Sequence, residues 1–400
     1  MCLYNISLVL KNRNLLIIAL IAVVNALGYG IIIPILYTYS VKFGLSDFQN
    51  GLLFAVFSVF QFISTPFIGR MSDKYGRKPL LVISLAGTAI SFFMAAFAPN
   101  AAFLFIARAL DGITAGNIPV ASAVISDTTE PKDRAKGFGI IGASFGFGFI
   151  FGPAISAVTV GFGDAIPFII AGVISVVAVI LTALILPETN KHLGEIRKGK
   201  LFDMKKFFHA LIDENVGATF LISLVYSFAF GMLIYGFQPY SVKVLKLSAN
   251  EISALFTLFG VVGLITQIAF LPKVTKILGD KKSFQYSLLL LSFAFLGMFL
   301  ITDIFLFVVI SIIFGFANSF VNPLIQTILS KETDEKSQGS MLGLNASYIS
   351  IGTIFGPIFG GVIATYSIAS PFLAGGVCIL ICFLLTSRVL KRGVKKESAF

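Results

Sequence analysis

Residues Gly69–Lys78 read GRMSDKYGRK and hold five charged side chains in ten positions. The stretch before them, Gly51–Ile68, carries no charge, and neither does the stretch after them, Pro79–Ala107. Each flank is long enough to cross a bilayer as a helix, which takes about 20 mostly apolar residues. The segment therefore reads as a short polar loop that joins two membrane-spanning helices.

The composition of the whole chain also indicates a membrane protein. Apolar residues make up 57% and charged residues 12%, whereas soluble domains hold about 25% charged residues. The net charge of +11 is spread thinly over short loops, without an aromatic-interleaved patch, which argues against a nucleic-acid partner. There are only two histidines and no nucleotide-binding loop. We therefore expect no enzyme activity, no metal site and no cofactor.

Twelve apolar runs reach membrane length, which predicts an all-α membrane protein with 12 transmembrane helices. The runs are about twice as long as the strands of a membrane barrel and do not alternate in polarity. The expected spans are residues 14–37, 49–69, 79–98, 101–126, 137–160, 165–186, 216–240, 250–272, 283–301, 303–328, 340–364 and 369–389.

The distribution of Lys and Arg predicts the orientation. If the N-terminus is cytoplasmic, 26 basic residues fall in cytoplasmic segments, and only Lys42, Lys243 and Lys246 fall on the opposite side. Short cytoplasmic loops are where basic residues accumulate. We therefore expect both termini in the cytoplasm and an inner or plasma membrane location. The run from Leu15 to about Tyr37 has no small-residue cleavage site, so we expect it to be retained as the first span.

The two sets of six spans repeat one another. Residues 204 positions apart match at Pro119 and Pro323, Ser126 and Ser330, Gly148 and Gly352, Gly152 and Gly356, and Pro153 and Pro357. Because six is even, both halves would enter the membrane the same way up, as a parallel repeat. We expect an N-terminal six-helix bundle at residues 1–186, a cytoplasmic linker with a surface helix at 187–215, and a C-terminal six-helix bundle at 216–400. The linker is either a tether at the lipid headgroups or a regulatory contact.

Five motifs carry a family resemblance. They are GRMSDKYGRK, Arg108–Gly112 (RALDG), Gly148–Pro153 (GFIFGP), Leu186–Thr189 (LPET), and Gly28–Gly30 followed by Pro34. Together they resemble the major facilitator superfamily and, within it, the drug/proton antiporters of the tetracycline-exporter-like branch. The resemblance implies two six-helix bundles around a central cavity lined by helices 1, 4, 7 and 10. Many such antiporters have an acidic residue in helix 1 where this chain has Asn25, which cannot titrate.

Arg108 and Asp111 are the only charges that we expect within the hydrocarbon region. An ionised side chain there costs about 2.5–3.5 kcal/mol on insertion scales. Their spacing places both on one helix face, where they can pair. In one interpretation the pair is a permanent bridge that fixes the fourth span against the first. In the other, Asp111 exchanges a proton with the cavity, and Arg108 tunes the pKa of Asp111. The resemblance links this arginine to proton transfer.

The charged loop is a candidate gate. Its glycines, Gly69 and Gly76, allow close backbone approach. Asp73 can accept hydrogen bonds from a helix N-terminus, and Arg77 can pair with Asp73 or with an acidic partner across the loop. The resemblance implies that the loop, including Lys78, latches the cytoplasmic ends of the halves with the eleventh span as partner. The alternative is a solvated loop that only sets topology.

Two glycine–proline motifs fall in the fifth and eleventh spans. Small residues four positions apart let helices pack closely, and a proline removes a backbone hydrogen bond and kinks its helix. The resemblance adds a role in preventing leak between the halves. The residues are Gly148, Gly152 and Pro153 in one half and Gly352, Gly356 and Pro357 in the other.

Polar residues within the spans predict a cavity. Each of them either lines the cavity or makes a hydrogen bond between helices. Such a polar, nearly uncharged cavity with aromatic faces suits a bulky amphipathic or cationic organic molecule better than a sugar phosphate. The candidates are Asn25, Tyr29, Gln61, Asn117, Tyr226, Tyr235, Gln238, Asn318, Asn322, Gln326 and Asn345.

The leading functional prediction is a secondary transporter that exports drug-like molecules in exchange for protons. A proton symporter or uniporter of a neutral metabolite is the alternative within transport, favoured by Asn25. A membrane receptor or assembly factor that does not transport is the alternative of another class. The expected partners are a small organic substrate, protons and the lipid bilayer, with the chain acting as a monomer.

Overall fold

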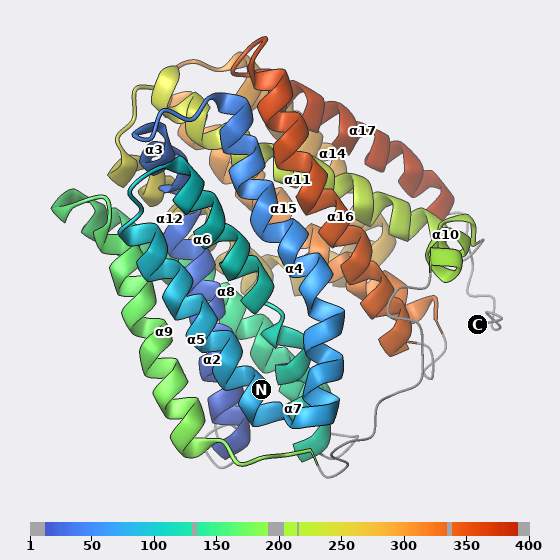
Figure 1. The fold of residues 1–400 in the computed structure, drawn as a ribbon. Helices are drawn as coiled ribbons and strands as arrows, with labels where there is room; N and C mark the ends of the chain where they lie inside the picture. Colours follow the sequence, from blue (N-terminus) through green and yellow to red (C-terminus); the bar gives the residue numbers. More distant parts are fainter. Residues whose placement is uncertain (1–12, 130–133, 191–203, 214–215, 334–337, 391–400) are drawn as a thin grey trace. The chain divides into compact units, whose positions relative to one another are not determined.

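The computed structural model describes residues 13–129, 134–190, 204–213, 216–333 and 338–390. Within these ranges the regular structure is helical throughout, and 12 helices or helix pairs are long and apolar enough to cross a membrane (Figure 1). The prediction of an all-α protein with 12 transmembrane helices is therefore confirmed for fold class and span number.

The helices of the first half lie at the expected spans, but the loop predicted at Gly69–Lys78 is wrong: α4 continues through it to Tyr75, and only Gly76 separates α4 from α5. The helices are α2 (Arg13–Ile32), α3 (Leu36–Val41), α4 (Asp47–Tyr75), α5 (Arg77–Ala96), α6 (Ala101–Thr114), α7 (Asn117–Thr128), α8 (Arg134–Thr159), the short 3-10 helix η2 (Val160–Phe162) and α9 (Ile166–Ile185).

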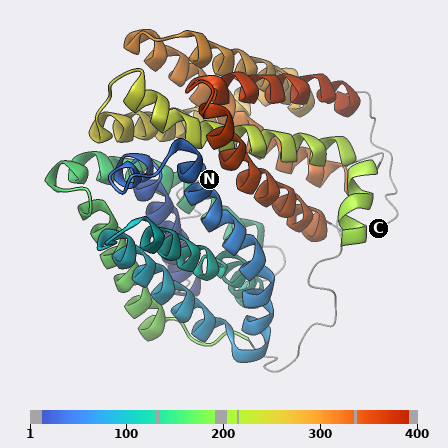
Figure 2. The same cartoon turned by 45° about the horizontal axis from the view of Figure 1, so that its top comes forward.

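The helices of the second half lie at the expected spans, preceded by α10 in the predicted linker, and Figure 2 shows them from a second direction. They are α10 (Met204–Ile212), α11 (Gly217–Lys243), α12 (Ala249–Ile265), the π-helical segment η3 (Thr266–Phe270), α13 (Leu271–Leu278), α14 (Asp280–Leu300), α15 (Ile304–Lys331), α16 (Gln338–Ala364) and α17 (Ser370–Leu390).

The chain forms two compact units. The first comprises Met1–Gly44, Val56–Leu201 and Ala249–Thr257, and the second comprises Leu45–Ala55, Phe202–Ser248 and Leu258–Phe400. The start of α4 thus groups with the second unit and the start of α12 with the first. This exchange of short segments does not follow from the repeat in the sequence.

One predicted span is two helices. The sequence predicted a continuous helix over residues 101–126, but α6 ends at Thr114 and α7 begins at Asn117. Pro119 has no N–H to donate to the carbonyl four residues earlier, at Ala115. At Gly116, an added Cβ would lie 2.6 Å from Ile68 of α4. The break therefore has both a backbone cause and a packing cause.

Glycines allow close helix packing in the first unit. A Cβ added to Gly30 of α2 would lie 2.5 Å from the Gly148 carbonyl oxygen of α8, and one added to Gly152 would lie 2.7 Å from the Gly30 Cα. The two backbones thus approach closely, next to a core that includes Ile18 and Ile21.

The second unit repeats this contact between α11 and α16. A Cβ added to Gly352 would lie 2.6 Å from the Phe228 nitrogen, and one added to Gly356 would lie 2.5 Å from the Phe228 carbonyl oxygen. Pro357, like Pro153 in α8, lies inside its helix. The close packing expected from the glycine–proline motifs is present in each unit.

The short helix α10 lies where the sequence predicted a surface helix. Phe207 stacks against Tyr348 of α16 with ring centroids 4.4 Å apart, and its carbonyl accepts a 2.6 Å hydrogen bond from the Tyr348 hydroxyl. Phe208 is 60% exposed. The helix therefore docks on the second unit by one face and leaves the other open. Residues 191–203, including Leu201 and Asp203 of the predicted helix, lie outside the described part of the chain.

Candidate functional site

A buried ion pair lies in the first unit. The Arg108 Nη1 and Asp111 Oδ2 atoms of α6 are 2.7 Å apart, and their side chains are only 6% and 8% exposed. The Arg108 guanidinium also lies 4.6 Å from the centre of the Phe57 ring of α4. Its Nε is buried without a hydrogen-bond partner. The pair predicted from the i, i+3 spacing is present, and one donor of the arginine remains unused.

Helix α2 supplies the aromatic and amide neighbours of this pair. The Tyr29 ring packs against Phe57 and Phe149, with centroids 6.1 Å and 5.9 Å apart. Asn117 of α7 donates a 3.0 Å hydrogen bond to the Asn25 side-chain oxygen. Asn25 and Asn117 therefore bind each other across two helices, and Tyr29 shares the Phe57 ring with Arg108.

In the second unit, one helix face carries three of the predicted cavity residues. Asn318 accepts a 2.8 Å hydrogen bond from the Tyr226 hydroxyl of α11. Asn322 and Gln326 follow at four-residue steps on α15 and are exposed. The three amides form a polar stripe along one face of α15.

The other predicted cavity residues lie apart from these groups. Tyr235 is fully buried, and its hydroxyl donates a 2.7 Å hydrogen bond to the Asp47 carbonyl within the second unit. Gln238 is also fully buried. Asn345 is buried, with its side-chain oxygen unpaired among the described residues, and Gln61 is half-buried on α4.

Arg77 is the centre of a charged network at the predicted gating loop. Its Nη1 lies 2.6 Å from Asp73 Oδ1 and 2.7 Å from the Ser72 hydroxyl, and its Nε lies 3.2 Å from Asp127 Oδ2 at the end of α7. The predicted pairing of Arg77 with Asp73 is present. The second acid, Asp127, was missed because it lies 50 positions away.

Glu188 has the role that the sequence assigned to Asp73. Its Oε1 and Oε2 accept hydrogen bonds of 2.9 Å and 3.1 Å from the backbone N–H groups of Arg77 and Lys78. A carboxylate at this position satisfies free N–H groups and the positive end of the helix dipole of α5. The prediction that Asp73 caps this helix is wrong, because its carboxylate is held by Arg77. The LPET motif at Leu186–Thr189, which contains Glu188, was the signal in the sequence that could have predicted this contact.

The two glycines of the predicted loop differ, since Gly69 lies inside α4 and Gly76 lies between α4 and α5. Gly76 has a φ of 106°, which is strained for other residues, and an added Cβ would collide with Glu188. At Gly69 an added Cβ would meet nothing within 4 Å. The close approach predicted at Gly76 is therefore confirmed, with Glu188 as the neighbour. The prediction of a close approach at Gly69 is wrong within the described part of the chain.

A known protein family matches almost the whole chain. The family model described as Major Facilitator Superfamily matches residues 18–215 and 219–400. This chain belongs to the major facilitator superfamily. The superfamily comprises membrane transporters that carry small molecules, so the protein is a multi-pass transporter and not an enzyme.

Relatives within the superfamily match over almost the full chain. Multidrug resistance protein 1 of Bacillus subtilis (strain 168) is 32% identical over 384 residues, which cover 94% of this chain and 96% of that protein. Tetracycline resistance protein, class H, of Pasteurella multocida is 30% identical over 371 residues and covers 90% of each chain. The crystal structure of the human organic anion transporter MFSD10 has a TM-score of 0.71 at 21% identity, covering 94% of this chain and 99% of that one; this similarity shows the shared fold.

Proposed function

We propose that this superfamily member exports amphipathic, drug-like organic molecules in exchange for protons by alternating access. Full-length relatives that are named for multidrug and tetracycline resistance support the substrate class. The observation that carries the proposal is the buried Arg108–Asp111 pair. A membrane-buried ion pair is costly, and ionisable residues within spans commonly serve proton or substrate pathways.

Asp111 is the proposed proton carrier. It is the only acidic residue away from the ends of the described spans. Its arginine neighbour leaves Nε unused, so the guanidinium has spare hydrogen-bonding capacity when the carboxyl changes protonation. The Asn25–Asn117 bond holds α2 against α7, so that the helices flanking the pair keep a defined spacing.

The proposed substrate contacts are neutral and aromatic. Within the second unit, the α15 stripe of Asn318, Asn322 and Gln326 offers amide groups, and Tyr226, bonded to Asn318, offers a ring. Amides orient an organic molecule through hydrogen bonds, and aromatic faces attract a delocalised cation. This combination supports amphipathic cations over phosphorylated or dicarboxylic substrates.

The network of Arg77, Asp73 and Asp127 is the proposed latch of the transport cycle. Charged groups that are half-buried and paired in one state can be released in another, which makes such a network suited to a two-state element. On the distribution of basic residues we place the latch and both termini in the cytoplasm, in the inner or plasma membrane, with the chain acting as a monomer.

Transport by proteoliposomes with an imposed pH gradient tests the proposal. Wild-type protein is expected to accumulate a fluorescent lipophilic cation against its gradient, and Asp111→Asn is expected to bind the cation but lose uphill transport. Asp303→Asn is the matched control, because Asp303 caps the N-terminus of α15 and asparagine is also a good cap. Undiminished uphill transport by Asp111→Asn would contradict the proton role.

A uniporter or symporter of a neutral metabolite is not favoured, because the relatives are named for drug resistance; its one support is that Asn25 stands where many similar antiporters have an acid. The same vesicles distinguish it. A uniporter would equilibrate its substrate without a pH gradient, and a symporter would move substrate in the same direction as protons.

A further inference from the structure

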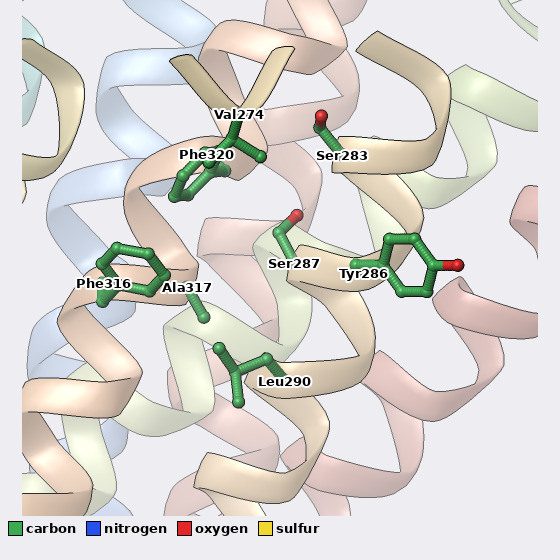
Figure 3. Close-up of a pocket in the computed structure, with 8 residues that line it drawn as sticks. All are labelled: Val274, Ser283, Tyr286, Ser287, Leu290, Phe316, Ala317 and Phe320. Carbon is green, nitrogen blue, oxygen red and sulfur yellow. The ribbon is translucent and has the colours of Figure 1, made fainter. Parts of the chain in front are cut away.

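A cavity of about 100 Å³ lies between α13, α14 and α15 in the second unit (Figure 3). In Figure 3, Ser287 and Leu290 of α14 lie opposite Phe316 and Ala317 of α15, with Val274 and Phe320 at one end. The cavity shares no residue with the Arg108–Asp111 pair or with the network of Arg77, Asp73 and Asp127. The residues that line it are Val274, Ser283, Tyr286, Ser287, Leu290, Phe316, Ala317 and Phe320.

The cavity is chemically apolar despite its serines. The Ser283 hydroxyl donates a 2.7 Å hydrogen bond to the Gly279 carbonyl, and the Ser287 hydroxyl donates a 2.8 Å bond to the Phe284 carbonyl. Both donors are therefore already used by their own helix. Ordered water in a cavity needs two to four polar partners, whereas apolar cavities of this order stay dry and accept apolar guests. The suitable occupant is a hydrocarbon segment.

The backbone beside the cavity is irregular. The π-helical segment η3 ends at Phe270, and Pro272 follows inside the first turn of α13, where it cannot donate to the carbonyl four residues earlier. Single π-helical turns are frequent at functional sites. The irregular step comes directly before Val274, so it sets where α13 leaves space beside α14 and α15.

Three lysines stand next to the cavity-lining residues. Lys273 adjoins Val274, Lys276 lies on the next turn of α13, and Lys282 precedes Ser283. All three are exposed, and none has an ion-pair or hydrogen-bond partner among the described residues. By contrast, the neighbouring Lys281 lies 2.9 Å from the Glu332 carboxylate. The α13–α14 junction therefore carries three lysines without a partner among the described residues, whereas its acid, Asp280, is paired with Lys331.

The surface beyond the lysines is suited to lipid. Ile277 is 79% exposed and Tyr286 53% exposed, on the same two helices that carry the lysines. A phospholipid places its phosphate at the membrane interface and its acyl chains along the spans. The second unit matches this order, with lysines at the α13–α14 junction and the apolar cavity along α14 and α15. A transport substrate would need polar groups aimed at it, whereas the two serine donors are used within α14 and the Tyr286 hydroxyl points away from the other lining residues (Figure 3).

We propose that this cavity holds an acyl chain of an anionic phospholipid whose headgroup phosphate is bound by Lys273, Lys276 and Lys282. Juxtamembrane lysine clusters attract anionic lipid, and the cavity adds selectivity by taking the chain. The site goes beyond the proposed export function and does not depend on its direction or on protons.

Native mass spectrometry of the full-length protein, with phosphatidylglycerol or phosphatidylcholine of identical chains, tests the charge recognition. Wild-type protein is expected to retain phosphatidylglycerol preferentially. The variant Lys273→Gln/Lys276→Gln/Lys282→Gln is expected to lose about a hundredfold in that preference. Lys246→Gln, an exposed lysine in another loop, is the control and is expected to keep it. Equal retention of the two lipids by wild-type protein would overturn the proposal.

A second measurement tests the position of the acyl chain. Phosphatidylglycerol with a photoreactive diazirine in one acyl chain is expected to label peptides that contain Ser287–Leu290 or Phe316–Phe320, and Ala317→Leu is expected to reduce this labelling by filling the cavity. Labelling spread evenly over the lipid-facing helices would overturn the proposal. If the fluorescent cation, but not unlabelled phosphatidylglycerol, reduced the labelling of these peptides, the cavity would bind substrate. That result would overturn the proposal as well.

Discussion

At the scale of single residues, Glu188 makes the helix-cap contacts that the sequence suggested for Asp73, and Asp73 makes only its other predicted contact, with Arg77. Both are acids near the start of α5, yet only Glu188 reaches the free backbone N–H groups, while Asp73 lies one helical turn before Arg77 and binds its side chain. Asn190 adds a 2.8 Å hydrogen bond to the Asp73 carbonyl. The segment after α9 therefore holds both sides of the loop, and we expect it to be part of the latch.

Replacing Glu188 with Ala is expected to reduce transport turnover and to lower the stability of the first unit by about 1 kcal/mol, the usual cost of a lost helix cap. Glu188→Gln retains acceptor capacity and is expected to lie between wild type and Ala. Substrate flux into vesicles measures the turnover, and thermal unfolding of purified protein measures the stability. Equal flux by Ala and wild-type protein would exclude Glu188 from the latch.

Asp73→Ala is expected to slow turnover while membrane insertion remains normal. The change leaves Arg77 only Ser72 and Asp127 as side-chain partners, which weakens the paired state of the latch without touching the spans. Initial transport rates divided by the amount of inserted protein give the comparison. Asp73→Glu, which keeps the charge, should recover part of the rate, whereas a full wild-type rate in Asp73→Ala would show that the loop only sets topology.

At the scale of helices, the close pairs α2–α8 and α11–α16 depend on glycines at their crossing points. Gly152 of α8 approaches the α2 backbone so closely that an added Cβ would lie 2.7 Å from the Gly30 Cα. Gly146 lies on the same helix, but an added Cβ there would meet nothing within 4 Å. Both glycines lie inside α8, but only Gly152 packs closely against another helix. Gly146 is therefore a matched control for a substitution at Gly152.

Gly152→Ala is expected to destabilise the protein by about 1–3 kcal/mol, because the added methyl forces the two backbones apart. Gly146→Ala is expected to be neutral or slightly stabilising, since alanine restricts the unfolded chain and favours the helix. Thermal unfolding of the two purified variants in one detergent measures the difference. Equal stability of the two would mean that α2 and α8 do not depend on this close approach.

At the scale of the whole molecule, orientation is the property that the positions of the basic residues predict most strongly. In a variant whose cysteines are replaced, Lys246→Cys is expected to react with a membrane-impermeant maleimide added outside intact cells, because its loop faces outward. Lys74→Cys is expected to react only after the membrane is permeabilised. The reverse pattern would invert the proposed topology, and with it the placement of the latch in the cytoplasm.

The fold was predictable because its signals are local. A run of apolar residues must lie in lipid as a helix wherever its neighbours are, so the number of spans follows from hydropathy. The breaks were less predictable. Pro119 is visible in the sequence, but prolines also occur inside intact helices, as Pro153 does in α8. Whether a proline breaks a span also depends on how the neighbouring helices pack against it. The break before Pro119 could be explained only once the structure placed Gly116 against Ile68 of α4.

The sequence alone determined that this chain is a helical membrane protein with twelve spans, and that Arg108 and Asp111 pair, because these properties depend on neighbours within a helical turn. Only the tertiary structure determined which distant residues meet: Arg77 with Asp127, Arg77 with Glu188, and Asn25 with Asn117, at separations of 50, 111 and 92 positions. The physical reason is that a hydrogen bond needs atoms about 3 Å apart, and across such separations that proximity is set by how whole helices pack.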